Sequence, residues 1–122
     1  MNEKPVFMQL MDVIEDAIIT LKYAAGDLIM SSNTICKLYK VNPATAMRAL
    51  SLLSADGILE KDRGIGMRVA SDAVQIIKNR RKDNLVQVML SEIVKEAEKL
   101  GITNNELVSM LESKLVKNMR KE

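Results

Sequence analysis

Residues 41–59 read VNPATAMRALSLLSADGIL, a stretch that contains the start, the apolar face and the end of one helix. Asn42 is a favourable N-cap, and Pro43 follows at the first helical position, where its missing N–H would have had no helical partner. Gly57 accommodates the left-handed conformation that commonly ends a helix. The sequence therefore predicts a helix over residues 43–56. Its inward positions are Ala46, Ala49, Leu50 and Leu53.

Two further helices are predicted before this one and a β-hairpin after it. Apolar residues recur at helical spacing from residue 5 to about 22, with Leu21 the last of them, and Ser31 is a suitable N-cap for a short helix that ends near Tyr39. Residues 58–61 and 67–69 are strand-like and flank a turn with two glycines. Three helices followed by a hairpin is the layout of a winged helix-turn-helix, in which the third helix enters the DNA major groove.

The remainder of the chain, from about residue 71, is predicted to be helical again. Gly101 divides it, and Thr103 with Glu106 forms a capping box for the last helix. Apolar residues before Gly101 follow heptad spacing, and those after it form one stripe. One interpretation is that the two helices pack on each other. Two helices alone bury both apolar faces poorly, so we expect a homodimer interface made by Val86, Leu90, Ile93, Ala97, Leu100, Leu107, Leu111 and Leu115.

The predicted fold class is therefore mainly α. A winged helix-turn-helix DNA-binding domain is expected over residues 1–70, followed by a two-helix dimerisation region over residues 71–122.

The composition excludes several classes of protein. The 122 residues contain no His and one Cys, so neither a His-assisted nucleophile nor a His-based metal site can form, and there is no internal disulfide. No apolar run is long enough to cross a membrane, and the N-terminus does not have the layout of a signal peptide. We expect a cytoplasmic protein that is not an enzyme and uses no metal, cofactor or membrane. Residues 31–70 carry six basic and three acidic side chains, which favours an anionic partner.

A set of motifs extends through residues 5–70. It begins with Pro5-Val6-Phe7-Met8-Gln9-Leu10, continues through Ala25-Gly26-Asp27 and residues 41–50, and closes with Asp56-Gly57-Ile58-Leu59 and residues 63–69. Together these motifs resemble the DNA-binding domain of the GntR family of bacterial transcription regulators. The helices after residue 70 are similar to the short C-terminal part of its YtrA-type subfamily. The resemblance implies a homodimeric repressor of its own operon, often one that encodes an ABC transporter, bound to a near-palindromic operator.

The helix-turn-helix geometry and the resemblance predict which residues contact DNA. In the first turns of helix 43–56, Arg48 can pair with guanine, and Thr45 can donate to phosphate or touch a thymine methyl. Arg63 and Gly64 lie at the hairpin tip, where a small turn with one Arg suits a minor groove. The predicted set is Asn33, Asn42, Ala44, Thr45, Met47, Arg48, Arg63, Gly64 and Arg68.

Several of these residues also have an interpretation without DNA. Asn42 can be only a helix cap, Met47 only a packing residue and Arg48 only a solvated cation. The basic run Lys78, Arg80, Arg81 and Lys82 is either a solvated face or a contact to the DNA backbone.

The chain also departs from the family pattern at contact positions. Asn33 stands where the family usually has Arg, and Ile65, Met67 and Arg68 stand where the wing usually has Lys, Thr and Phe. Arg68 is a candidate to compensate for the lost contacts. The departure at Asn33 motivates an alternative function, a winged-helix module that binds protein instead of DNA. An enzyme that works with carboxylates alone has no supporting pair of residues, and no motif identifies a small-molecule effector.

Overall fold

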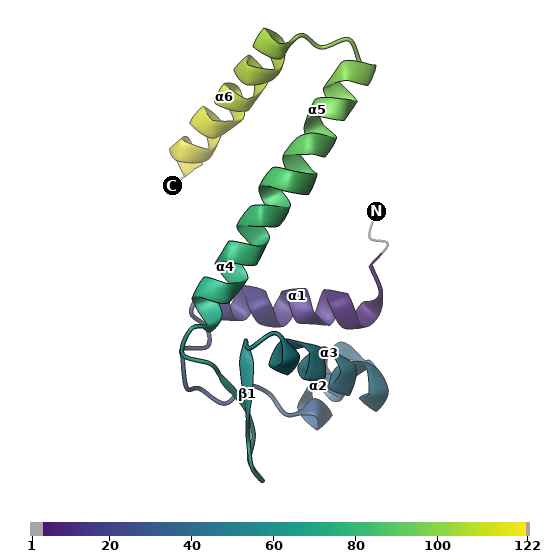
Figure 1. Ribbon diagram of the computed structural model, residues 1–122, viewed down its shortest axis with the longest axis vertical. Helices are drawn as coiled ribbons and strands as arrows, with labels where there is room; N and C mark the ends of the chain where they lie inside the picture. Colours follow the sequence, from purple (N-terminus) through teal and green to yellow (C-terminus); the bar gives the residue numbers. More distant parts are fainter. Residues whose placement is uncertain (1–3, 122) are drawn as a thin grey trace. The chain divides into compact units, whose positions relative to one another are not determined.

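The computed structural model describes residues 4–121. The elements follow one another as α1 (Val6–Ile19), α2 (Ser32–Tyr39), α3 (Pro43–Ala55), β1 (Leu59–Asp62), β2 (Gly66–Val69), α4 (Ala73–Asn84), the π-helical segment η1 (Leu85–Met89), α5 (Leu90–Lys99) and α6 (Asn104–Lys121) (Figure 1). The chain divides into two compact units, Met1–Arg81 and Lys82–Glu122. The mainly helical fold class and the β-hairpin are as predicted.

The helices of the first unit begin and end where the local chemistry places them. The Asn42 side chain accepts a hydrogen bond from the Thr45 N–H at 2.9 Å, and Ser31 accepts one from Thr34 at 3.1 Å, so both predicted N-caps are confirmed. Gly57 follows the end of α3 with a φ of +80°, the left-handed conformation that glycine adopts without strain.

The end of α1 differs from the prediction. The helix stops at Ile19, and Leu21 adopts a φ of +62° with 71% of its surface exposed. Leu21 continues the apolar spacing of the helix, but it lies one turn beyond the last residue that the core can cover.

The hairpin is a two-stranded antiparallel sheet in which Leu59 pairs with Val69 and Asp62 with Gly66. The segment before α2 joins its far edge. The Gly26 N–H donates to Val69 O at 2.8 Å, and the Ile29 N–H donates to Met67 O at 3.0 Å. Residues 25–27 belong to the motifs that resemble the GntR family. The structure adds that this segment braces the wing.

The core of the first unit lies between α1, α3, the hairpin and the start of α4. Its buried residues include all four predicted inward positions of α3. Ala73 and Ile77 of α4 belong to the same core. Because these two residues are buried there, the first compact unit extends to Arg81, beyond the boundary expected at residue 70.

The second unit contains the end of α4, η1, α5 and α6. The predicted capping box is present: the Thr103 N–H donates to Glu106 Oε1 at 3.0 Å, and the Glu106 N–H donates to Thr103 Oγ1 at 3.2 Å. Within the described part of this unit, Ala97 is the one buried residue. None of the described helices is long and apolar enough to cross a membrane.

Candidate nucleic-acid interface

The first turns of α3 present several side chains to solvent. Ala44 and Met47 are exposed, Met47 at 59%, and Thr45 is half-buried. Met47 is therefore not a packing residue within the chain. Asn42 uses its Oδ1 for the cap, so only its amide nitrogen is left to donate. Asn33 is exposed near the start of α2.

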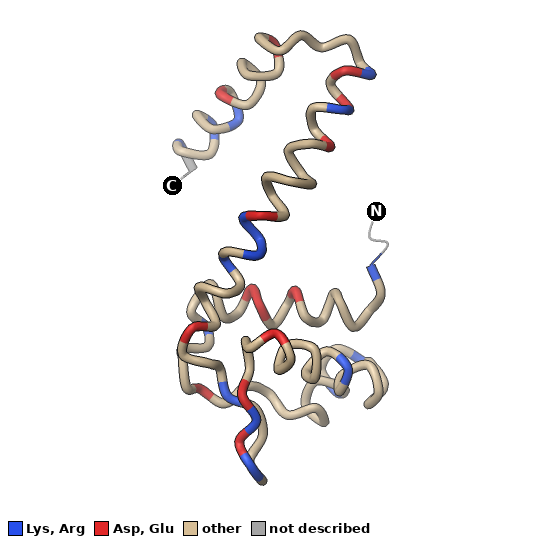
Figure 2. The backbone as a smooth tube through the Cα atoms, viewed as in Figure 1, with Lys and Arg blue, Asp and Glu red and all other residues tan. Residues whose placement is uncertain are grey.

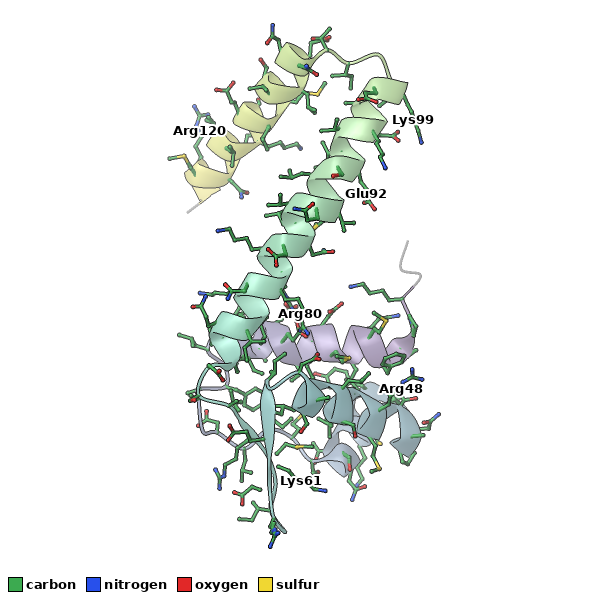
Figure 3. The ribbon with its side chains drawn as sticks, viewed as in Figure 1. Arg48, Lys61, Arg80, Glu92, Lys99 and Arg120 are labelled. Atoms are coloured by element: carbon green, nitrogen blue, oxygen red, sulfur yellow. The ribbon has the colours of Figure 1, made fainter. Side chains whose placement is uncertain are left out.

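Arg48 lies against the beginning of α1. Its guanidinium carbon is 4.0 Å from the centroid of the Phe7 ring, a cation–π contact (Figure 3). The residue as a whole remains exposed. A guanidinium that stacks by its face keeps its N–H edges free to donate, so the ring orients Arg48 without using its hydrogen-bonding groups.

The hairpin tip is small and exposed. The Ile65 N–H donates to Asp62 O at 3.0 Å and closes the turn, with Gly64 at a φ of +74°. Arg63 and Gly64 are exposed, and Ile65 is 61% exposed. The tip thus combines one cation with one apolar side chain and bare backbone.

Arg68 has a different environment from Arg63. Its Nε donates to the Asp62 carboxylate, and its Nη1 donates to Gly26 O at 2.9 Å. These bonds tie β2 to β1 and to the segment before α2. The guanidinium that was a candidate replacement for lost DNA contacts is occupied inside the wing.

The cations of α2, α3, the hairpin and α4 differ in whether a carboxylate binds them. Arg68, Arg80 and Arg81 are bound to carboxylates. By contrast, the described residues provide no ion-pair partner for four cations of α2, the turn after it and the hairpin, which are Lys37, Lys40, Lys61 and Arg63. Figure 2 shows Lys and Arg around α2 and α3 and at the end of the hairpin.

Sequence reasoning did not single out Lys37, Lys40 and Lys61. The positive excess of residues 31–70 was their only signal, because charge counting does not show which cations are paired. We use the name cationic face for Lys37, Lys40, Lys61 and Arg63 with the exposed first turns of α3, a set that also has the exposed Glu60 next to Lys61 on β1.

The basic run of α4 is largely committed within the protein. Arg80 contacts Glu15 and Asp56, and Arg81 contacts Glu15 and Asp16. Burial of Arg80 opposes its charge, but the nearby Glu15 and Asp56 outweigh this effect and raise the pKa of Arg80 above its usual value. Burial of Arg81 also opposes its charge, but the Asp16 and Glu15 carboxylates outweigh this effect and raise the pKa of Arg81 above its usual value. Of the four cations in the run, these two are therefore not free for a DNA backbone.

The predicted interface residues lie on η1, α5 and α6. Leu100, Leu111 and Leu115 are more than half exposed, Ile93 is 50% exposed, and Leu107 is half-buried. Val86 and Leu90 are also exposed, whereas Ala97 is already buried by its own chain.

Among the described residues, no group of three or more His, Cys, Asp or Glu side chains is arranged to hold a metal ion. An open depression of about 400 Å³ lies along α6, and all five of its lining residues come from that one helix.

Comparison with known proteins agrees with this geometry. The model of the gntR family of bacterial regulatory proteins matches residues 8–69. The chain is 32% identical over 107 residues to the uncharacterized HTH-type transcriptional regulator YhcF of Bacillus subtilis (strain 168), a match that covers 88% of this chain and 87% of YhcF.

Solved structures share the fold. A GntR family transcriptional regulator from Listeria monocytogenes matches with a TM-score of 0.76 and 26% identity, over 93% of this chain and 97% of that one. A transcriptional regulator from Oenococcus oeni matches with a TM-score of 0.78 and 24% identity, over 94% of each chain. The family consists of regulators and not of enzymes. The chain therefore belongs to the gntR family of bacterial regulatory proteins and is a DNA-binding transcriptional regulator whose first unit is a winged helix-turn-helix.

Proposed function

We propose that the protein is a homodimeric repressor that binds a near-palindromic operator. The observation that carries this proposal is that the cations without ion-pair partners, Lys37, Lys40, Lys61 and Arg63, lie on α2, on the turn after it and on the hairpin, and that α2 and β1 both contact α3. A winged helix-turn-helix contacts DNA with its third helix and its wing. Free cations at the same place supply the attraction to phosphate.

In this proposal the first turns of α3 enter a major groove. Arg48, held by Phe7, reaches a base edge or a phosphate, and exposed Met47 makes apolar contact with base edges. Thr45 and the Asn42 amide donate to the backbone, and Ala44 allows close approach. Asn33 contributes a weaker, neutral contact from α2.

The wing reaches the neighbouring groove. Arg63 and the bare backbone of Gly64 approach the minor groove, where negative potential is concentrated. Arg68 acts indirectly, because its bonds to Asp62 and Gly26 hold the wing in shape. Lys37, Lys40 and Lys61 add phosphate contacts.

The homodimer is supported by the apolar surface of the second unit. Ile93, Leu111 and Leu115 are each at least half exposed to water in the single chain. Exposed apolar side chains gathered on one unit in this way indicate an interaction surface. A second copy of the same chain offers a complementary heptad seam, and twofold symmetry then places two copies of α3 on two half-sites.

Repression follows if the dimer covers a promoter. We assign the protein to the YtrA-type subfamily, acting in the cytoplasm. We further propose that its target is its own operon, with an ABC transporter gene as the expected neighbour.

A selection from randomised duplex DNA tests the proposal. The folded protein is expected to enrich a sequence with twofold symmetry, and its affinity for that duplex should fall steeply as salt rises, because bound cations release counterions. Equal binding to the selected duplex and to unrelated DNA would contradict sequence specificity. A folded dimer that binds no DNA would support the protein-binding alternative.

Repression is tested separately. A reporter gene under the protein's own promoter is expected to be more active when the regulator is deleted. Unchanged activity would contradict control of its own operon, and lower activity would identify an activator.

A further inference from the structure

A buried carboxylate in the first unit is held by two arginines of one helix. The Glu15 side chain on α1 is only 5% exposed. Arg80 Nη2 donates to Glu15 Oε2, and Arg81 Nε donates to Glu15 Oε1 at 3.2 Å. Both oxygens of the carboxylate are therefore bound by α4.

Each arginine also binds a second carboxylate. Arg80 Nη1 donates to Asp56 Oδ2 at 2.8 Å, and Arg81 Nη1 donates to Asp16 Oδ1 at 2.6 Å. Asp56 is the residue that ends α3, and Asp16 lies on α1. We call these five residues the clamp. It joins α4 to α1 and to the C-terminal end of α3.

The clamp constrains the orientation of α4 more tightly than folding of the first unit requires. Ala73 and Ile77 already bury the first turns of α4 in the core. Buried ion pairs add little net stability over apolar replacements of similar size. The two arginines instead fix the direction of α4, since a planar guanidinium binds two acceptors only at defined angles.

We infer that Arg80 and Arg81 are positioning residues that set the spacing between the operator half-sites this protein accepts. The clamp fixes the direction of α4 with respect to α3 inside the first unit. In the proposed homodimer, joined through the residues after α4, we expect that direction to influence the distance between the two copies of α3. The inference rests on the proposed function and adds to it a determinant of specificity that touches no DNA.

The test uses duplexes that differ only in half-site spacing. Two copies of the half-site selected by the wild-type protein are placed at the selected spacing, or with one or two base pairs added at the centre. Fluorescence anisotropy gives the affinity for each duplex at one salt concentration. The wild type is expected to prefer the selected spacing by about tenfold, a typical coupling between two sites.

Two variants remove the clamp in different ways. E15Q/R80M/R81M removes it without leaving a buried unpaired charge. R80K/R81K keeps every charge but cannot bridge two carboxylates at fixed angles. Both are expected to bind the selected spacing and the lengthened spacings with similar affinity, while binding to a duplex with one half-site stays unchanged. If the triple variant does not fold, the lysine variant decides. A wild-type spacing preference in the folded clamp variants would overturn the inference.

K78M/K82M is the matched control, because it removes two cations of α4 that lie outside the clamp. It is expected to keep the spacing preference. Loss of the preference in this control would assign the effect to the charge of α4 and overturn the inference. Failure of the wild type to select any duplex would instead contradict the proposed function.

Discussion

The first unit contains a core of buried apolar side chains from α1, α2, α3 and the hairpin, whereas in the described part of the second unit only Ala97 is buried. Ile18, Ile35 and Leu53 have no exposed surface in the first unit, while Leu100 in the second is 64% exposed. Both units contain well-capped helices, so helix formation is not what separates them. The difference indicates that the first unit has a complete core and the second completes its core with another chain.

The largest effect is expected from a substitution that disrupts the proposed dimer interface. Ile93→Asp places a carboxylate in the proposed interface of both copies, and a buried unpaired charge costs several kcal/mol. The dimer dissociation constant should rise at least about a thousandfold. Sedimentation velocity should then show a mass near 13.6 kDa instead of twice that value. Lys95→Asp on the same helix is the control and should remain dimeric. A dimeric Ile93→Asp variant would contradict the interface.

A cavity in the first unit should have the next largest effect. Leu53→Ala is expected to lower the free energy of unfolding by about 2–5 kcal/mol, because the side chain is fully buried. Met119→Ala removes a side chain that is 73% exposed and should change it by less than about 0.5 kcal/mol. Urea unfolding at one protein concentration measures both. Equal losses would remove the contrast between the units.

Arg48→Ala tests the DNA contact proposed for α3 of the first unit. It should weaken binding to the selected duplex by about 1–3 kcal/mol and relax specificity if the contact is to a base. Phe7→Leu removes the ring but keeps the guanidinium and is expected to have a smaller effect. Anisotropy titrations compare the two. Full affinity and specificity of Arg48→Ala would exclude it from the interface.

The cap of α3 gives a smaller effect, on stability. Asn42→Ala should cost about 1 kcal/mol because the Thr45 N–H loses its acceptor. Asn42→Ser restores an acceptor and should recover most of the loss. If Asn42→Ser is stable but binds DNA less tightly, the amide nitrogen contacts DNA. If binding is unchanged, Asn42 is a cap only.

The smallest effect concerns pH and the second unit. The Thr103 backbone N–H donates to Glu106 and lowers the pKa of that carboxyl below its usual 4.5. The ionised carboxylate therefore stabilises the start of α6 above pH 4.5, and this contribution is lost as the pH falls through the lowered value. Glu106→Gln should remove that part of the pH dependence. Hydrogen exchange of the first turn of α6 measures it, and identical pH profiles would contradict the prediction.

The sequence predicted the features that depend on near neighbours. Asn42, Pro43 and Gly57 act on the backbone within four residues, so the limits of α3 could be predicted from them. The hairpin follows from its two glycines in the same way. Leu21 shows the limit of periodicity, because spacing does not indicate where the covering core ends.

Features that depend on distant residues could not be predicted. The clamp joins residues 65 positions apart, and the same arginines look like a solvated or DNA-binding run when only their neighbours are known. Arg68 reaches the Gly26 carbonyl across 42 positions. Whether Lys37 or Lys61 has an ion-pair partner likewise depends on residues that are distant in the sequence. The candidate contacts on α3 were predicted because helix-turn-helix geometry places them by position along one helix.

Native mass spectrometry of the protein mixed with its selected duplex tests the central claim most directly. The account predicts complexes with two chains per duplex and no stable complex with one chain. The reason is that the second units hold two chains together as a dimer before the first units bind DNA. A complex with one chain bound to the full duplex at comparable abundance would contradict it.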